Sequence, residues 1–354
     1  MMKSHSSFVR VLAAVSLAAC FCLAQNASAD HIKPPEKDGK QSLTIPGKAG
    51  PGKGKRIVFI TGANEYNPEI GLPILARILA THHGFDCTVL FTVNKAGEID
   101  PNTGNNLPGT EALDHADLLV ILARFTTPTD EQMKHIVDYL DSGRPAIGMR
   151  TGTHSFAYPH NSHSIYKKFS WDNKDPNFEG GFGRQVLGET WITHHAPNGS
   201  TSTRGLFAKG AADDPILRGI ADGEIWGSTG VYGVRLPLLP NCKTLLLGEV
   251  IDGGKPSGKP VAGKLNNPMM PIAWTRTYSL VEGKTGRVFT TTMGSADDLI
   301  KSAALRRMIV NAAYWTTGLE DKIPAKADVD LVGGPTPFKK GTTIEQLQQW
   351  VDKP

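Results

Sequence analysis

The chain has 354 residues, a formal net charge of +4 and 20% charged residues. A charge so close to balance argues against a dedicated nucleic-acid-binding surface, which usually needs a basic face. With only four cysteines the chain is not a disulfide-stapled scaffold, and its length fits one large α/β domain with loops or a small appendage.

The first thirty residues have the three-part pattern of a secretory signal peptide. A positively charged start precedes an apolar run at 11–23, too short to span a bilayer, and an Ala-Ser-Ala cleavage pattern stands at 27–29. We therefore expect residues 1–29 to be removed and the mature chain to be periplasmic or secreted. A lipobox-like run at 17–20 offers the alternative of a lipidated Cys20. No later stretch is apolar and long enough to cross a membrane.

The next segments alternate between strand-like and helix-like patterns. Residues 30–54, rich in Pro, Gly and Lys, are expected to be a disordered linker. The predicted strands then cover 56–61, 87–93, 118–122 and 145–149, and the predicted helices cover 72–83 and 129–140. Thr129 is the expected N-cap of the second helix, with Gln132 three residues on. This alternation predicts an α/β fold with a mostly parallel sheet, helices on both faces, and a ligand site beyond the carboxyl ends of the strands.

The second half is less regular. Residues 161–225 are rich in Gly, Asn, Asp and Trp and are expected to form an elaborated segment over the site. Further β-like runs, at 244–250, 271–274 and 287–292, precede a helix at 302–316 that closes a domain spanning 55–324. A tail at 325–354 should carry a short helix introduced by Thr342 and Glu345. Cys87 is expected to be a buried thiol, and pairing of Cys87 with Cys242 stays open.

Several polar residues stand directly after predicted strands and are candidate ligand contacts: Asn64, Glu65, Tyr66, Arg124, Arg150 and Thr151. The run Gly148-Met149-Arg150-Thr151-Gly152 predicts the sharp strand-to-helix turn of a nucleophile elbow. Arginine cannot be a nucleophile, but such a turn exposes backbone N–H groups that hold an anion or a polar ligand. The alternative is a tight turn closed by the glycines, with Arg150 in an ion pair.

His154, Glu189, His194 and His195 are the candidate acid–base residues. Histidine suits proton transfer because its charge changes near neutral pH. Adjacent histidines point in different directions, and no His-x-x-x-His pattern is present, so no metal ligand is assigned and the cofactor stays unknown. Trp191, Trp226 and Tyr232 are candidates for stacking on a sugar ring, although most tryptophans pack in cores.

The chain resembles the ThuA-like (trehalose-utilisation) family, whose fold is that of class I glutamine amidotransferases. The resemblance runs from about Lys55 to Pro324 and rests on the following motifs: Ile60-Thr61-Gly62 with Glu65-Tyr66, Gly71-Leu72-Pro73, His83-Gly84-Phe85, Gly148 to His154, Gly180 to Trp191, His194-His195, Asp214-Pro215-Ile216, Trp226, Val231-Tyr232, Ala273-Trp274-Thr275 and Gly286 to Gly294.

This resemblance implies a flavodoxin-like sheet and a link to disaccharide or oxidised-sugar metabolism. Two departures bear on activity. An amidotransferase needs a cysteine where Arg150 stands, and ThuA-like relatives often carry a histidine where Ser295 stands. Glutamine amidotransferase activity is therefore not expected.

These features lead to three hypotheses. The first is a protein that binds or acts on a carbohydrate or keto-sugar, by proton abstraction beside a carbonyl or by lyase-type cleavage if it is an enzyme. The second is a non-catalytic module that binds a glycan or a protein, and the third is a metal-dependent hydrolase. The expected partner is a small carbohydrate rather than a nucleic acid, and the sequence leaves homo-oligomer formation open.

Overall fold

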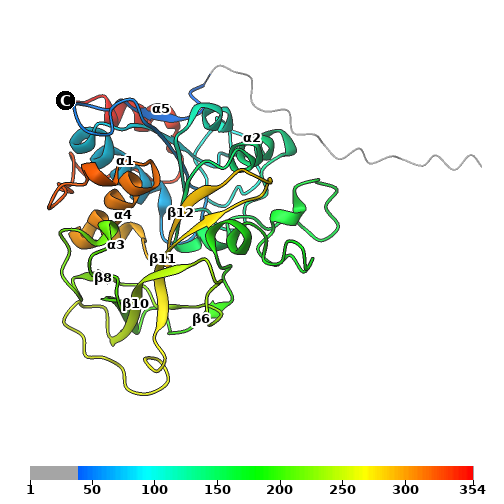
Figure 1. Cartoon of the computed structure of the whole chain (residues 1–354). Coiled ribbons are helices and arrows are strands. Elements are labelled where there is room, and N and C mark those ends of the chain that lie inside the picture. Colours follow the sequence, from blue (N-terminus) through cyan, green and yellow to red (C-terminus); the bar gives the residue numbers. More distant parts are fainter. Residues whose placement is uncertain (1–38, 354) are drawn as a thin grey trace, which may run out of the picture. The chain divides into compact units, whose positions relative to one another are not determined.

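The predicted parallel strands form one half of a ten-stranded sheet with the order β1-β3-β2-β4-β5-β12-β11-β10-β7-β8 (Figure 1). The structure is a computed structural model that describes residues 39–353, so the expected signal peptide and its lipobox alternative lie outside the described residues. The strands of the first half are β1 (Leu43–Ile45), β2 (Arg56–Ile60), β3 (Asp86–Leu90), β4 (Leu118–Ile121), β5 (Ala146–Met149) and β12 (Gly286–Thr291). Among these six strands all pairings are parallel except that of β1 with β3, and β12 also pairs antiparallel with β11 of the second half.

Helices cover both faces of this parallel half, as predicted. They are α1 (Pro68–His83), α2 (Asp130–Asp141), α3 (Ala296–Lys301), α4 (Ala303–Thr316) and α5 (Ile344–Val351). Alternate residues of β2 face opposite layers: Ile57 and Phe59 pack with α1 and α4, whereas Val58 and Ile60 pack with α2. Parallel strands buried on both faces read as continuous apolar runs, which is the pattern seen in this sequence.

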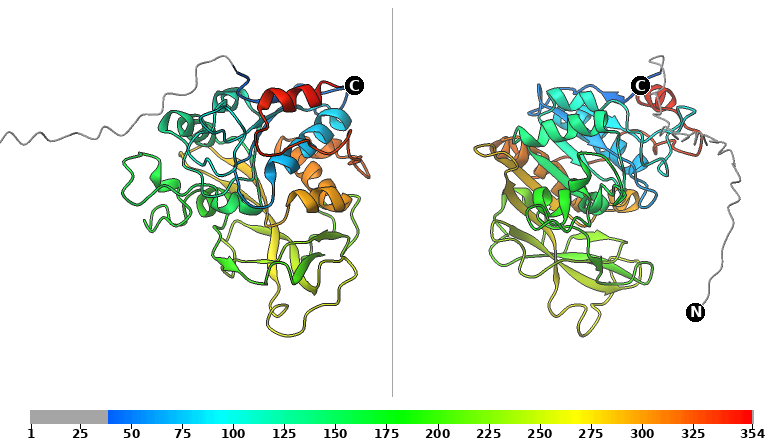
Figure 2. Two further views of the ribbon diagram at one scale, coloured as in Figure 1. Left: turned by 180° about the vertical axis from the view of Figure 1, so that it is seen from behind. Right: turned by 90° about the vertical axis from the view of Figure 1, so that its right-hand side faces the viewer.

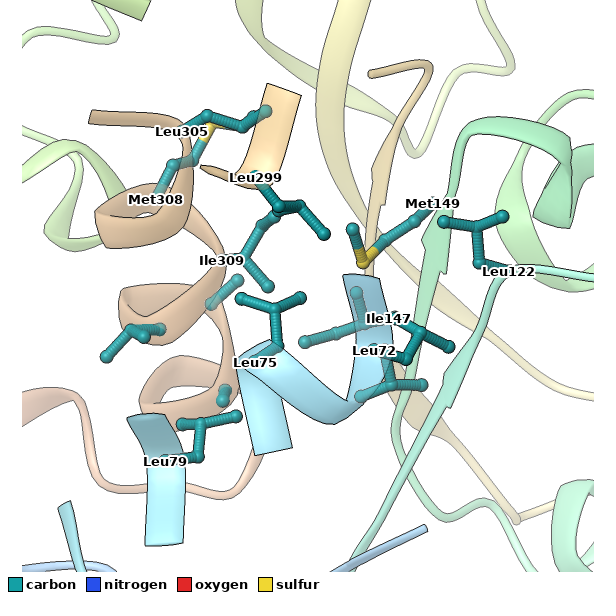
Figure 3. Packing of buried hydrophobic residues seen from close by; sticks show 14 of the residues in the cluster. Leu72, Leu75, Leu79, Leu122, Ile147, Met149, Leu299, Leu305, Met308 and Ile309 are labelled. Carbon is teal, nitrogen blue, oxygen red and sulfur yellow. The ribbon is translucent and has the colours of Figure 1, made fainter. Parts of the chain in front are cut away.

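The layer between α1, α4 and the sheet is filled by aliphatic side chains. Leu72 and Leu75 of α1 lie between Ile309 of α4 and Ile147 of β5 (Figure 3). All of these side chains are fully or almost fully buried. Leu72 and Leu75, which are spaced i, i+3 in the sequence, therefore lie on the inner face of the helix.

The second half of the sheet is antiparallel. It consists of β11 (Met270–Tyr278), β10 (Lys243–Asp252), β7 (Thr201–Phe207) and β8 (Ile225–Gly227). A separate two-stranded pair joins β6 (Thr193–His194) to β9 (Tyr232–Gly233). Figures 1 and 2 show this part, in green and yellow, extending beyond the helices.

The disordered-linker prediction is wrong for the described part of residues 30–54. Leu43–Ile45 forms β1, which pairs with β3 and buries Leu43 and Ile45. Helix α5 covers this edge strand, and the Gln348 amide bonds both the N–H and the C=O of Thr44. An edge strand capped in this way offers no free pairing groups at Thr44.

The terminal helix also differs by one residue from the prediction. Thr343, not Thr342, is the N-cap of α5, and its capping partner is Gln346 rather than Glu345. The capping box of Thr129 and Gln132 on α2 is confirmed. Cys87 is buried, and within residues 39–353 neither Cys87 nor Cys242 forms a disulfide. No helix within residues 39–353 has the length and apolar character needed to cross a membrane.

Candidate functional site

Three neighbouring parallel strands deliver most of the predicted site residues to one edge of the sheet. Asn64, Glu65 and Tyr66 follow β2, Arg124 follows β4, and the 3-10 turn Arg150–His154 follows β5. Because β2, β4 and β5 are adjacent and parallel, their carboxyl ends lie side by side. This edge is the one expected from the strand order.

Backbone strain is concentrated at the same edge. The non-glycine residues with positive φ in the described part of the chain are Tyr66 (66°), Asn67 (49°), Phe125 (52°) and Arg150 (41°). Such conformations are unfavourable for residues with a side chain and persist where the surrounding structure holds them, often at functional sites. All of them follow strands β2, β4 and β5.

The turn at Arg150 has the shape predicted for a nucleophile elbow. Arg150 has positive φ, and glycines on both sides let other chain segments approach closely. A Cβ at Gly152 would stand 2.6 Å from the Ile121 carbonyl oxygen, and one at Gly148 would clash with the Leu187 side chain. Both glycines are therefore explained by packing around the turn.

The Arg150 side chain points inward and is only 1% exposed. Its Nη1 donates to the carbonyl oxygens of Gly230 (2.9 Å) and Thr292 (2.8 Å), and its Nη2 donates to the Tyr66 hydroxyl (3.1 Å). The guanidinium also lies over the Tyr232 ring, 3.7 Å from its centroid. No ion pair to Arg150 forms among the described residues.

This geometry changes the expected role of Arg150. Protein oxygens and ring faces occupy the guanidinium, and among the residues that the structure describes only Nε has no partner. Arg150 therefore acts as a positioning residue that joins the ends of β2 and β12 to the segment around Gly230. A buried arginine with these partners is costly to remove because each carbonyl would lose its donor.

Ring side chains gather next to Arg150 and form what we call the aromatic cluster: Phe125, His154, Trp171, Trp191, His194 and Tyr232. The His154 ring centroid lies 5.0 Å from that of Phe125, 5.4 Å from Trp191 and 6.0 Å from Tyr232. Trp171 and His194 continue the cluster at 5.4 Å and 5.9 Å from Trp191. His194 is exposed and both tryptophans are half-buried, so the cluster reaches the surface.

Two of the predicted histidines belong to this cluster. His154 is 3% exposed, and its Nδ1 lies 3.2 Å from the Thr153 hydroxyl. Burial lowers the pKa of His154 well below its usual value, and the nearby positive charges of Arg124 and Arg150 lower it further. Burial, followed by the charge of Arg150, also lowers the pKa of His194. Both imidazoles are therefore neutral at neutral pH.

Other predicted residues do not join the cluster. The buried Glu189 carboxylate is held by Arg235 (2.6 Å) and Arg184 (3.1 Å), which is a structural ion-pair arrangement. His195 places its Nε2 3.0 Å from the Leu265 carbonyl oxygen. Trp226 lies on β8 and donates its indole N–H to Ser202. The geometry does not support catalysis by Glu189 or His195, or ligand stacking by Trp226.

Thr151 is buried within the elbow turn, and its hydroxyl has no hydrogen-bond partner in the described part of the chain. Ser295, which stands where relatives often have a histidine, caps α3 by accepting from the Asp298 N–H at 3.2 Å. This position therefore has a local structural role. Across residues 39–353, no group of three or more His, Cys, Asp or Glu side chains is placed to hold a metal ion.

Arg124 marks the boundary between the cluster and a surface hollow. Its Nη1 donates to Asn64 Oδ1 at 3.0 Å, its Nε lies 3.5 Å from Glu65 Oε2, and its guanidinium lies over the Phe125 ring. The hollow has a volume of about 580 Å³ and is lined by the residues Asn64, Pro101, Asn102, Thr103, Gly104, Asn105, Arg124, Phe125 and Thr127. Sequence reasoning missed the 101–105 segment and Asn198, which also contacts Arg150, because neither belongs to a recognisable motif.

A buried carboxyl group supports the loop after β2. Glu69, the second residue of α1, is 1% exposed, and its Oε1 accepts from the Gly62 N–H at 3.3 Å. Burial raises the pKa of Glu69 from 4.5 to about 7. This hydrogen bond joins the first turn of α1 to the start of the loop that supplies Asn64, Glu65 and Tyr66.

Solved structures that resemble this chain share little sequence identity with it. A ThuA-like protein from Bacteroides uniformis has 13% identity and a TM-score of 0.45, over 77% of this chain and 94% of that one. One from Parabacteroides merdae has 14% identity and a TM-score of 0.44, over 82% and 96%. The glutaminase domain of Trypanosoma brucei CTPS has 10% identity and a TM-score of 0.36, over 77% and 98%. No curated protein matches the chain.

The decisive match is to a family rather than to any one protein. The family model ThuA, described as trehalose utilisation, matches residues 57–316 and so covers most of the chain. The matched range begins within β2, at Ile57, and includes β3, β4, β5, β12 and all of the aromatic cluster. The chain therefore belongs to the ThuA trehalose-utilisation family.

Proposed function

We propose that this chain is an exported protein that binds a carbohydrate or a keto-sugar on the aromatic cluster. The observation that carries the proposal is the gathering of ring side chains, partly exposed, beside polar groups at three strand ends. Aromatic faces stack on the apolar C–H faces of sugar rings, while nearby amides and charged groups bond the hydroxyls. Trp171 and Trp191 would supply the stacking, and Asn64, Glu65 and Arg124 the polar contacts.

A binding experiment tests this proposal directly. The purified protein is heated in the presence of trehalose, glucose and keto-sugars, and a ligand that binds only the folded state raises the melting temperature. Trp191→Ala should abolish the shift because it removes a stacking face. Trp350→Ala is the matched control, since Trp350 lies in α5 and stacks on Arg77 of α1, away from the cluster. If no sugar raises the melting temperature of the folded protein, the proposal is refuted, and a protein-binding module becomes the favoured function.

Acid–base catalysis on a bound keto-sugar is the second candidate function. It is favoured by the convergence of His154 and His194, whose rings both contact Tyr232 and Trp191. A neutral imidazole can accept the proton that leaves a carbon beside the carbonyl, while the electron pair moves onto the carbonyl oxygen. The charge of Arg124 would stabilise the resulting oxyanion, and return of the proton completes the exchange.

Adjacent histidines provide the test of catalysis. His194→Ala should reduce turnover of a keto-sugar about a hundredfold if His194 moves the proton. His195→Ala is the control, because that side chain is turned toward the Leu265 carbonyl. If the two substitutions reduce turnover equally, or if the unmodified protein binds the sugar without turning it over, the catalytic candidate is rejected. Binding would then be the function that remains.

Export is the remaining part of the proposal and rests on the signal-peptide pattern at 1–29. Mass analysis of the protein recovered from cell fractions should find a first residue of Asp30. If the first residue is instead a lipidated Cys20, the protein is exported as a membrane-anchored lipoprotein. An intact N-terminus in the cytoplasmic fraction would contradict export.

A further inference from the structure

The Tyr66 hydroxyl oxygen accepts two hydrogen bonds within the candidate site. Arg150 Nη2 and Asn198 Nδ2 each donate to it over 3.1 Å. The Gly230 N–H orients the Asn198 amide by donating to its Oδ1 at 2.7 Å, so the nitrogen of that amide is the atom that faces Tyr66. Two donors, one of them charged, therefore converge on a single phenol oxygen.

The hydrogen of the Tyr66 hydroxyl needs a separate acceptor. A guanidinium group and an amide nitrogen have no lone pair that can accept a hydrogen bond, so neither Arg150 nor Asn198 Nδ2 can take it. The Tyr232 hydroxyl lies close to that of Tyr66, and Tyr232 is buried. Whichever of these two tyrosines passes its hydrogen to the other, one O–H of the pair has no acceptor among the described residues. Tyr66 is only half-buried, so it is the member of the pair that a ligand can reach.

The surrounding structure holds Tyr66 in place before any ligand arrives. Its φ of 66° is unfavourable for a residue with a side chain, so contacts must maintain it. The Tyr66 carbonyl oxygen accepts from the Ala296 N–H at the start of α3 (2.9 Å). The Arg150 guanidinium lies over the Tyr66 ring, 4.6 Å from its centroid. A hydroxyl fixed in this way needs little reorganisation when it donates to a ligand.

Tyr66 borders the same place as the two histidines of the aromatic cluster. The Tyr232 ring lies against Arg150 (3.7 Å) and is 5.3 Å from the His194 ring and 6.0 Å from the His154 ring. The neutral imidazoles can accept a proton, and the Tyr66 hydroxyl can donate one. These are the two roles that acid–base chemistry beside a carbonyl group needs.

We infer that Tyr66 is the general acid of this site and donates its proton to the carbonyl oxygen of the bound keto-sugar. The inference rests on the proposed acid–base function, in which His194 removes the proton from the carbon beside the carbonyl. The electron pair of the broken C–H bond forms a C=C bond, and the carbonyl oxygen takes the Tyr66 proton, so the product is an enediol. Arg150 and Asn198 stabilise the phenolate that Tyr66 becomes, and return of both protons restores the imidazole and the phenol.

Deuterium exchange followed by NMR tests this role. The purified protein is incubated in D₂O with D-fructose, L-sorbose or 3-keto-D-glucose, whose C–H beside the carbonyl exchanges with solvent when an enediol forms. Tyr66→Phe should lower the exchange rate about a hundredfold and change the dissociation constant of the sugar less than about threefold, because a general acid acts in the transition state. Tyr166→Phe is the matched control, since Tyr166 is a half-buried tyrosine beside Lys134 and Asp138 of α2.

Asn198 provides a readout that a purely structural role of Tyr66 would not move. Asn198→Ala removes one donor from the phenolate and should slow exchange about tenfold, the value of one hydrogen bond. In a Tyr66→Phe background the same substitution should have no further effect, because no phenolate is formed there. If the effects of the two substitutions simply multiply, Asn198 does not act through Tyr66 and the inference is overturned.

A second variant keeps the test decisive if Tyr66→Phe does not fold. Asn198→Asp places a carboxylate oxygen where Nδ2 faces Tyr66, which opposes a negative charge on the phenol oxygen. Exchange should therefore be slower with Asn198→Asp than with Asn198→Ala. Exchange that is equally fast or faster with the aspartate would refute the phenolate.

The outcomes separate the role of Tyr66 from the function on which it rests. If the unmodified protein exchanges none of the three keto-sugars, the acid–base function fails and the role of Tyr66 fails with it. If the unmodified protein catalyses exchange and folded Tyr66→Phe does so at the same rate, only the role of Tyr66 is refuted. A Tyr66→Phe variant that loses affinity for the sugar in proportion to its rate would make Tyr66 a binding residue and not the acid.

Discussion

Replacing Glu69 by glutamine should change how the stability of this protein depends on pH. Burial raises the pKa of Glu69 from 4.5 to about 7 in the folded protein. Between these values the unfolded chain releases a proton that the folded chain keeps, so the free energy of unfolding falls as pH rises. The difference between the two pKa values corresponds to about 3 kcal/mol of lost stability, complete just above neutral pH.

Glutamine cannot ionise and keeps nearly the shape of the protonated carboxyl, including an oxygen that can accept from the Gly62 N–H. Glu69→Gln should therefore gain most of that 3 kcal/mol relative to the unmodified protein between about pH 4.5 and pH 8. Urea unfolding of both proteins at the two pH values gives their free energies of unfolding. Contributions from other titratable groups cancel when the two proteins are compared at the same pH.

Glu131→Gln is the matched control because Glu131 is an exposed acid in the first turn of α2. It should change stability by less than about 0.5 kcal/mol at either pH. A stability difference between Glu69→Gln and the unmodified protein that is the same at both pH values would refute the reasoning, because burial would then not disfavour the charged carboxylate.

Three further predictions concern stability. Arg150→Met should destabilise the protein by about 3 kcal/mol or more in urea unfolding, because buried carbonyl groups lose their donors. Gln348→Ala should cost about 1–2 kcal/mol, since the N–H and the C=O of Thr44 in the edge strand both lose their hydrogen bond to the Gln348 amide. Burial lowers the pKa of His83 and of His154, so stability should fall as pH drops below about 6.5. His154→Gln should flatten that loss, and an unchanged profile would contradict the assignment.

Local signals in the sequence were sufficient for the parallel strands β2, β3, β4 and β5. The apolar run at 56–60 and the capping box of Thr129 and Gln132 are read from residues close together in the chain, and the structure confirms both. Strand β1 was missed because three residues within a Pro/Gly-rich stretch carry too little pattern. Its stability comes from β3 and α5, which are distant in sequence.

For the candidate site, too, some features could be predicted from the sequence and others depend on contacts between distant residues. The order of strands and helices placed Asn64, Arg124 and Arg150 at one edge, since parallel strands end together. The sequence could not show that His194 turns toward the cluster while its neighbour His195 turns away, because that depends on the pairing of β6 with β9. Likewise, the ion pairs that occupy Glu189 come from Arg184 and Arg235, and the second of these is remote in sequence.

The sequence by itself determined the α/β class, the family and the edge of the sheet at which the candidate site residues gather, because these depend on short-range periodicity and on motifs. Only the tertiary structure decided what each residue does there. Arg150 is an internal support because Tyr66, Gly230 and Thr292 converge on it from separate parts of the chain. The hollow lined by 101–105 exists because that segment is fastened to the end of β4. Contacts of this kind join residues with no sequence relation, so they appear only when the chain is folded.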